Sequence, residues 1–235
     1  MASSVQKQTE INNHEKLLKQ LFNCAISQAL PTKTITEFVP QNSKGKTVII
    51  GCGKASALMA KQFDECSDLN VSGLVVAPYG NRVKLNRIEV IEAAHPVPDQ
   101  NSVKAAERLL SMASKLGESD LLIFLVSGGG SAMTCLPAPG LSIIDKQSIN
   151  EALLKCGANI KEMNCVRKHL SAIKGGQLAA AAYPAKTLTL ALSDIPGDDP
   201  SVIASGPTVA DITTSDDALK IIKKYGMLII ENIKQ

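Results

Sequence analysis

Tryptophan is absent from this 235-residue chain, and Phe, Trp and Tyr together make up only 3% of it. The 25 Lys and Arg residues are nearly balanced by 22 Asp and Glu residues, and the two signs are interspersed. The chain therefore lacks both the basic stripe and the stacking side chains that are typical of nucleic-acid-binding proteins. We expect no nucleic-acid partner, and the net charge of +3 suits a small anionic substrate without pointing to one.

Cysteine is sparse, and its spacing forms no C-x-x-C pair and no cluster with His. That spacing excludes the common zinc sites, and a domain of this length does not need disulfides to be stable. We expect reduced thiols in a cytoplasmic protein, at Cys24, Cys52, Cys66, Cys135, Cys156 and Cys165.

Long apolar runs are also missing, so the sequence predicts no transmembrane helix and no membrane partner. The segment from Met1 to Leu30 is polar, with Lys and Glu mixed in, and it lacks the apolar centre of a signal peptide. It nevertheless has apolar residues at helical spacing, which predict an opening helix that docks on the core. These residues are Leu17, Leu18, Leu21, Phe22, Ala25 and Ala29.

Short apolar runs alternate with segments of helical periodicity from residue 47 onward. The run 121–126 is apolar throughout, as expected of a strand that is buried on both faces. This alternation predicts an α/β fold, with a mostly parallel, Rossmann-like sheet and helices on both faces. The predicted strands are 47–50, 73–77, 88–91, 121–126 and 187–192, and the predicted helices include 55–63, 101–116 and 216–225.

Ligands of open α/β sheets bind beyond the carboxyl ends of the strands, so the loops there are candidate sites. The first loop is Gly51-Cys52-Gly53-Lys54-Ala55-Ser56. It differs from a dinucleotide fingerprint, because Ser56 replaces the third glycine and no acidic residue ends the next strand at Ala77-Pro78. It is not a Walker A loop either, because Val48 occupies the first glycine position. The glycines either make only a tight turn or let a ligand approach the backbone beside Lys54.

The second loop is Val126-Ser127-Gly128-Gly129-Gly130-Ser131-Ala132. Consecutive glycines leave backbone N–H groups unobstructed, and a helix that starts near Ser131 would add a field that favours an anion. The loop does not fit a serine-hydrolase elbow, because Met133 stands where that motif requires glycine. A phosphate- or substrate-binding loop explains these residues together, and a flexible loop is the alternative. The binding residues would be Ser127, Gly128, Gly129, Gly130 and Ser131.

The third loop, residues 193–200, gathers Asp194, Asp198 and Asp199 after what reads as a buried strand. Carboxylates there can hold Mg²⁺ or accept a proton from a hydroxyl group, and an ordinary surface turn is the alternative.

The segment 164–176 carries cations between the second and third loops. If it is helical, Arg167, Ser171 and Lys174 fall on one stripe and could bind a phosphate or a carboxylate. A solvated basic face is the alternative, and His169 is expected to be structural.

Taken together, these segments resemble the glycerate kinase family that yields 2-phosphoglycerate, whose second domain is called MOFRL. The resemblance implies transfer of the ATP γ-phosphate to the 2-hydroxyl of D-glycerate with Mg²⁺. It further implies that Lys54 and Asp194 lie at the catalytic centre and the Ser/Gly loop at phosphate or substrate. The matching stretches keep the family's order: 51–56, His95-Pro96-Val97-Pro98-Asp99, 126–132, 164–176 and 193–208.

Each residue then has a physical task, because phosphoryl transfer depends mostly on positioning and on stabilising negative charge. Lys54 would neutralise the transferring group or the glycerate carboxylate, together with Arg167 or Lys174. Asp194 would orient the attacking hydroxyl, or would hold Mg²⁺ with Asp198 or Asp199.

The family's MOFRL domain follows the stretch matched here, so we expect residues 1–235 to be the N-terminal α/β domain only. We expect little or no kinase activity from this domain alone, and the oligomeric state, including a homo-oligomer, is left open. Two alternatives remain: a nicotinamide-dependent hydroxypyruvate or hydroxy-acid reductase, and a non-catalytic module that binds anions or nucleotides.

Overall fold

A computed structural model describes residues 4–30, 35–38, 44–66 and 70–227. The chain divides into two compact units, Met1–Thr34 and Ile35–Gln235, and each is described by itself. The first contains the helix α1 (Ser4–Ala29), as the sequence predicts. Its own unit does not cover the apolar stripe, in which Phe22 is 65% and Leu18 is 66% exposed, and the docking of this helix on the core stays a prediction.

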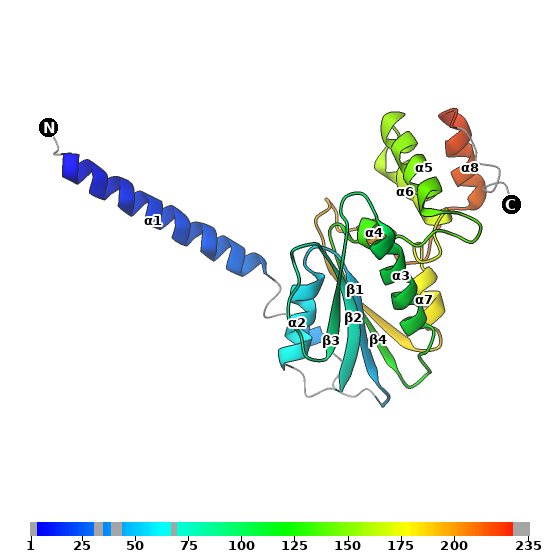
Figure 1. Cartoon of the computed structure of the whole chain (residues 1–235), viewed down its shortest axis with the longest axis horizontal. Coiled ribbons are helices and arrows are strands. Elements are labelled where there is room, and N and C mark those ends of the chain that lie inside the picture. Colours follow the sequence, from blue (N-terminus) through cyan, green and yellow to red (C-terminus); the bar gives the residue numbers. More distant parts are fainter. Residues whose placement is uncertain (1–3, 31–34, 39–43, 67–69, 228–235) are drawn as a thin grey trace. The chain divides into compact units, whose positions relative to one another are not determined.

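The second unit is built on a five-stranded parallel sheet in the order β3-β2-β1-β4-β5 (Figure 1). All five strands lie where the apolar runs predict them, and every residue of β1 and of β4 is buried. The predicted parallel, Rossmann-like α/β fold is therefore confirmed. The strands are β1 (Thr47–Cys52), β2 (Val71–Pro78), β3 (Ile88–Ala93), β4 (Leu121–Ser127) and β5 (Lys186–Leu192).

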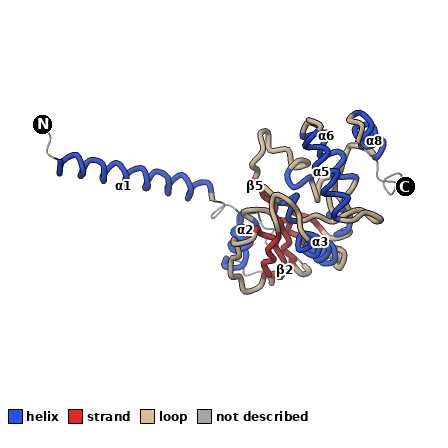
Figure 2. Tube along the Cα trace, turned by 45° about the horizontal axis from the view of Figure 1, so that its top comes forward, coloured by secondary structure: helices blue, strands red, loops and turns tan. Residues whose placement is uncertain are grey.

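Successive residues of a buried strand point to opposite faces of the sheet, so the sheet supports two apolar clusters. Ile49 and Ile123 pack with α2 (Ser56–Cys66) on one face. Ile50 and Phe124 pack with α3 (Gln100–Ala113) and α7 (Gln177–Ala182) on the other face. In Figure 2 the red strands lie between the blue helices α2 and α3.

The last strand departs from expectation, because β5 is the edge of the sheet and none of its residues is fully buried. The third candidate loop therefore follows a half-exposed edge strand rather than a buried one. An edge strand has a neighbour on one side only, which explains its lower burial.

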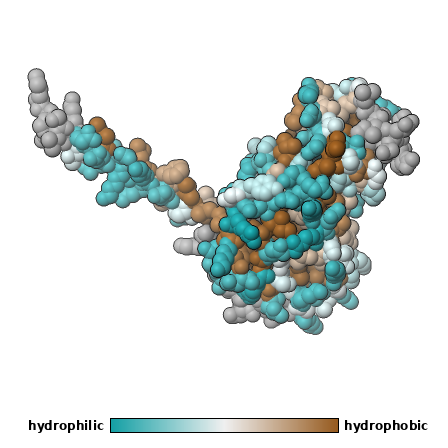
Figure 3. All heavy atoms as spheres, viewed as in Figure 1, coloured by the Kyte–Doolittle hydropathy of each residue, from teal (hydrophilic) through white to brown (hydrophobic). Residues whose placement is uncertain are grey.

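A third apolar cluster lies outside the sheet, between α5 (Ile143–Lys155), α6 (Ile160–His169) and α8 (Ser215–Lys224). We call these three helices the helical cap; Figure 1 shows them grouped beyond one end of the strands. Figure 3 shows brown, apolar patches over this part of the surface, where Ile144, Leu154 and Ile160 are exposed.

Short helices complete the described structure: α4 (Gly130–Met133) and two 3-10 turns, η1 (Ile35–Phe38) and η2 (Ile203–Ser205). No helix among the described residues has the length and apolar character needed to cross a membrane.

Candidate functional site

The loops after β1 and β4 are joined directly to each other. The backbone N–H of Lys54 donates to the carbonyl of Gly128 over 2.9 Å, and the N–H of Ala55 donates to Ser127 Oγ over 2.9 Å. From β1 the chain continues to β2 on one side, and β4 lies on the other side. Such a switch in direction is where α/β sheets bind ligands, so the first two candidate loops meet at the expected position.

Ser56, which replaces the third glycine of a dinucleotide fingerprint, has a structural role here. Its side chain is fully buried, and its hydroxyl lies within hydrogen-bond distance of the carbonyls of Gly53 (2.9 Å) and Val76 (2.8 Å). The hydroxyl therefore fastens the β1 loop to the end of β2.

Each glycine of the β4 loop faces a close neighbour, which explains why the loop has three of them. A Cβ atom at Gly128 would lie 1.9 Å from Asp194 Oδ2, and one at Gly129 would lie 2.9 Å from the His95 ring. At Gly130 it would lie 2.8 Å from Cys52 Sγ. These distances are shorter than van der Waals contact, so side chains are excluded and the neighbours reach the backbone.

Lys54, His95 and Asp194 all approach this loop, and all three side chains are exposed. The pKa of His95 lies below its usual value because of partial burial and the Lys54 charge, which the carboxylate of Asp194 opposes. The two residues expected at a catalytic centre, Lys54 and Asp194, therefore both lie within electrostatic reach of one imidazole. In the described part of the chain, no hydrogen bond or ion pair occupies the Asp194 carboxylate.

The other two acidic residues of the third loop are placed differently. Asp198 occupies a turn with a φ of 50°, and Asp199 accepts a hydrogen bond of 2.8 Å from the Ser201 N–H. No group of three or more His, Cys, Asp or Glu side chains in the described residues is arranged to hold a metal ion. A Mg²⁺ site at Asp194 with Asp198 or Asp199 thus stays a prediction.

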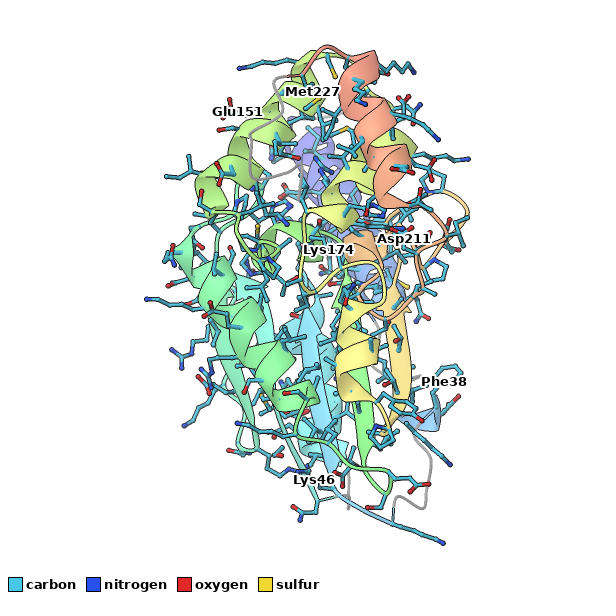
Figure 4. All side chains as sticks on the ribbon, turned by 90° about the vertical axis from the view of Figure 1, so that its right-hand side faces the viewer. Phe38, Lys46, Glu151, Lys174, Asp211 and Met227 are labelled. Atoms are coloured by element: carbon cyan, nitrogen blue, oxygen red, sulfur yellow. The ribbon has the colours of Figure 1, made fainter. Side chains whose placement is uncertain are left out.

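Next to the β4 loop, a pocket of about 280 Å³ opens toward the helical cap. Its polar lining comes from residues that are far apart in the sequence. Figure 4 shows one of them, Lys174, between the strands and the cap helices. The side chains and backbone that matter most here are His95, Gly129, Ser131, Lys146, Arg167 and Lys174.

Lys174 is only 3% exposed, and its Nζ donates to the Ser131 carbonyl (2.8 Å) and to Ser131 Oγ (2.6 Å). Burial disfavours its charged form, and Lys146 nearby adds repulsion, so the pKa of Lys174 falls to about 7.

Two more cations line the same pocket. Lys146 Nζ donates to the Leu170 carbonyl over 2.9 Å, and burial lowers the pKa of Lys146 to about 8. The Arg167 guanidinium donates to the amide oxygen of Asn150, over 2.7 Å from Nε, and burial lowers its pKa as well. Among the described residues, none of these three cations forms an ion pair with a carboxylate. With Lys146 still mostly protonated at pH 7 and Lys174 only partly so, the pocket carries positive charge that no carboxylate among the described residues neutralises.

The expected helical stripe of Arg167, Ser171 and Lys174 is wrong in its geometry. The helix α6 ends at His169, and Ser171 forms an antiparallel bridge with Pro137. The segment then turns at Gly175 and Gly176, which both have positive φ. An α-helix cannot continue through such a conformation. Lys174 nevertheless lies in the same pocket as Arg167, because the chain folds back toward Ser131.

His169 packs as a structural residue. Its Nδ1 lies 2.9 Å from the Cys165 carbonyl and 3.9 Å from Asp211 Oδ2, which ties α6 to the loop before α8.

Sequence reasoning missed three residues of this site: His95, Lys146 and Asn150. His95 could have been found, because it opens the motif His95-Pro96-Val97-Pro98-Asp99. Lys146 and Asn150 lie at helical spacing on α5, but nothing in the sequence of that helix indicates that it faces a site.

The chain is thus a parallel α/β domain in which Lys54 and Asp194 both lie near His95, beside a pocket lined by Lys146, Arg167 and Lys174. Residues 17–235 match the family described as "Domain of unknown function (DUF4147)". This match covers most of the chain, which belongs to that family.

Relatives in this family carry two kinds of name. A protein of Agrobacterium vitis named "Putative hydroxypyruvate reductase" is 50% identical over 220 residues, which cover 93% of this chain and 50% of the relative. The D-glycerate 2-kinase of Thermotoga maritima is 41% identical over 223 residues, covering 94% and 54%. The glycerate kinase of Homo sapiens is 35% identical over 238 residues, covering 89% and 46%.

Solved structures agree with these relatives. The crystal structure of Thermotoga maritima glycerate kinase superposes with a TM-score of 0.87 at 40% identity, over 95% of this chain and 54% of that one. These matches confirm the resemblance to glycerate 2-kinases in sequence and in fold. The chain spans about half the length of the relatives that it matches.

Proposed function

We propose that this chain is the part of a glycerate 2-kinase that binds ATP and D-glycerate, and that residues 1–235 correspond to its N-terminal domain. The observation that carries the proposal is the meeting of Lys54, Asp194 and the glycines of the β4 loop at the switch point of the sheet. The names of the kinase relatives support the reaction, which would move the γ-phosphoryl group to the 2-hydroxyl.

The chain's own residues suit the needs of phosphoryl transfer. The Lys54 ammonium would lie against the negative charge of the transferring group, and the free carboxylate of Asp194 would orient the attacking hydroxyl or accept its proton. The unobstructed backbone N–H groups of Gly128, Gly129 and Gly130, flanked by Ser127 and Ser131, would face an anion.

Mg²⁺ fits the same site, because this ion keeps several waters and often uses one or two carboxylates together with substrate phosphates. Asp194 would hold it, with Asp198 or Asp199 as the second carboxylate. When bound, Mg²⁺ neutralises charge on the phosphates.

The decisive test is phosphoryl transfer in a chimera, in which this chain replaces the aligned 223 residues of the Thermotoga maritima D-glycerate 2-kinase. We expect formation of ADP and 2-phosphoglycerate from ATP, Mg²⁺ and D-glycerate, and we expect the chain alone to give little or none.

In that chimera Lys54→Ala should lower kcat by roughly 100-fold or more, as expected for a group that stabilises transition-state charge. Lys61→Ala is the matched control, because Lys61 lies on α2 and, among the described residues, forms an ion pair with Glu65 alone, at the surface. A folded chimera without transfer activity, or near-normal turnover in Lys54→Ala, would contradict the proposal.

A hydroxypyruvate reductase is the second candidate, because relatives that are 50% and 54% identical carry that name. It has less support: β2 ends at Pro78 and is followed by Tyr79, so the chain has no acidic residue at the end of this strand, where a dinucleotide fingerprint places one. Loss of NADH absorbance on mixing the chain with hydroxypyruvate would favour the reductase. Nucleotide binding without either reaction would instead indicate a non-catalytic module.

We also propose a cytoplasmic location. It is supported by the free thiols of the five cysteines whose side chains the structure describes, since disulfides are rare in that compartment.

A further inference from the structure

We infer that the pocket between the β4 loop and the helical cap binds the carboxylate of the acceptor substrate, and that Lys146 and Asn150 determine its specificity. This inference rests on the proposed function and assigns one end of the acceptor to a place in the fold. The ligand class is a small 2-hydroxycarboxylate such as D-glycerate.

The first argument is charge. Lys146, Arg167 and Lys174 line one pocket without a carboxylate partner in the part of the chain that the structure describes, and Lys174 is buried. Burying cations without a counter-ion costs free energy, so the pocket gains stability when an anion enters. The one carboxylate at the pocket, Glu151, is exposed and pairs with Lys155 instead.

The second argument is the set of hydrogen-bond donors. Asn150 Oδ1 accepts from Arg167, and the amide nitrogen of Asn150 has no hydrogen-bond partner among the described residues, so it remains able to donate. Gln147 beside it is fixed differently, since its Nε2 donates to the Pro98 carbonyl over 2.8 Å. A guanidinium, an ammonium and an amide N–H₂ together match the oxygens of a carboxylate.

The third argument is position. The pocket shares His95 and Gly129 with the site of Lys54 and Asp194, so the two are continuous. A three-carbon acid with its carboxylate in the pocket would extend its hydroxyl toward Asp194. The pocket also has apolar lining, from Val97, Ala132 and Leu154, which suits a carbon chain better than a triphosphate.

The test is direct binding of D-glycerate to the 235-residue chain by titration calorimetry, with no nucleotide present. We expect D-glycerate to bind and glycerol, which lacks the carboxylate, not to bind. Lys146→Met should weaken D-glycerate binding at least tenfold. Lys155→Met on the same helix is the matched control and should bind as the unmodified chain does, because Lys155 is 78% exposed and lies outside the pocket.

Asn150→Asp is a second, isosteric variant that guards against a merely unfolded protein. Its carboxylate would pair with Arg167 and offset the pocket's charge, so glycerate binding should also fall at least tenfold while the circular dichroism spectrum is retained. In the chimera, Lys146→Met should raise KM for D-glycerate and leave KM for ATP within about twofold.

Three results would overturn the inference. The first is unchanged affinity of Lys146→Met for D-glycerate, and the second is no binding of D-glycerate to the unmodified chain. The third is that Lys146→Met loses binding of ATP or inorganic phosphate instead of binding of D-glycerate. Because calorimetry reads binding without transfer, its failure is distinct from failure of the kinase reaction, which the chimera reports.

Discussion

At the scale of single residues, the candidate site depends on the lack of side chains at three glycines of the β4 loop. The β4 loop has no side chains at 128–130, and this lets Asp194, His95 and Cys52 come within contact of its backbone. Lys54 and Asp194 both have exposed side chains. The contact of Asp194 with this loop depends on the lack of a side chain at Gly128.

Replacing Gly128 by Ala tests this dependence. The new Cβ would lie 1.9 Å from Asp194 Oδ2, so the carboxylate must move. Because Asp194 is exposed and can swing away, we expect the free energy of unfolding to change by no more than about 0.5 kcal/mol. Turnover in the chimera should fall roughly 100-fold from misplacement. Gly117→Ala is the control, because its Cβ would meet only Asp120 Oδ2 at 3.8 Å; equal turnover in both variants would count against the role of the loop.

Lys174 makes stability depend on pH in a direction that can be worked out. Its pKa is about 7 in the folded chain, and the unfolded value is near 10.4, so between these values the unfolded chain binds more protons. Stability from this group is therefore lost as pH falls and gained as pH rises. The groups that face it are Lys146, Arg167, Cys52 and Cys135.

Urea unfolding of the unmodified chain and of Lys174→Met measures this effect. Between about pH 7.5 and 9.5, the unfolding free energy of the unmodified chain should rise by about 2 kcal/mol relative to that of Lys174→Met. A pH-independent difference between the two proteins would refute the lowered pKa of Lys174.

At the scale of elements, the helical cap has an apolar core of its own. Leu153 and Val166 are fully buried in it, together with Ile222 of α8. The cap is also what closes the pocket, because α5 supplies Lys146 and Asn150 and α6 supplies Arg167. Its packing therefore sets where the pocket's cations lie.

Leu153→Ala should lower the free energy of unfolding by about 2–5 kcal/mol, because it leaves a cavity among three helices. Amide hydrogen exchange should accelerate in α5, α6 and α8 more than in β1 and β4, since the sheet has separate apolar clusters. The adjacent Leu154→Ala is the control: Leu154 is 61% exposed, so its loss should be well under that of Leu153. Equal losses from the two variants, or uniform exchange, would show that the cap is not an independent unit.

The sequence predicts elements best where burial is complete. The runs at 47–50 and 121–126 identify β1 and β4 because both faces of these strands are apolar. It fails where geometry is decided by distant packing. Arg167 and Lys174 share a pocket through a glycine turn rather than a helix, and Lys146 joins them from a helix that begins more than 20 residues earlier. The spacing of residues within one segment cannot predict that residues from separate segments line the same pocket.

At the scale of the whole molecule, the apolar clusters all belong to the second unit, Ile35–Gln235. The described side chains of α1 are exposed throughout. Because the α/β domain has apolar clusters of its own, we predict that it is stable without α1.

Removal of residues 1–34 should therefore leave the free energy of unfolding of residues 35–235 within about 0.5 kcal/mol of its value in the full chain. Chemical denaturation followed by circular dichroism measures it, with Leu153→Ala as the reference for a change that does destabilise. A loss of several kcal/mol on truncation would mean that α1 covers apolar surface of the domain.

The bonds that join the site also determine when it can exist during synthesis. Ala55 bonds to Ser127 across 72 residues, and Lys174 bonds to Ser131 across another 43. Such contacts form only after long loops have closed, which is slow compared with local helix formation. A nascent chain that has not reached residue 174 lacks the contact between Lys174 and Ser131, so we predict that partly folded chains do not bind a ligand at the proposed pocket. Bound ligand should therefore slow unfolding, and it should leave the rate of folding unchanged.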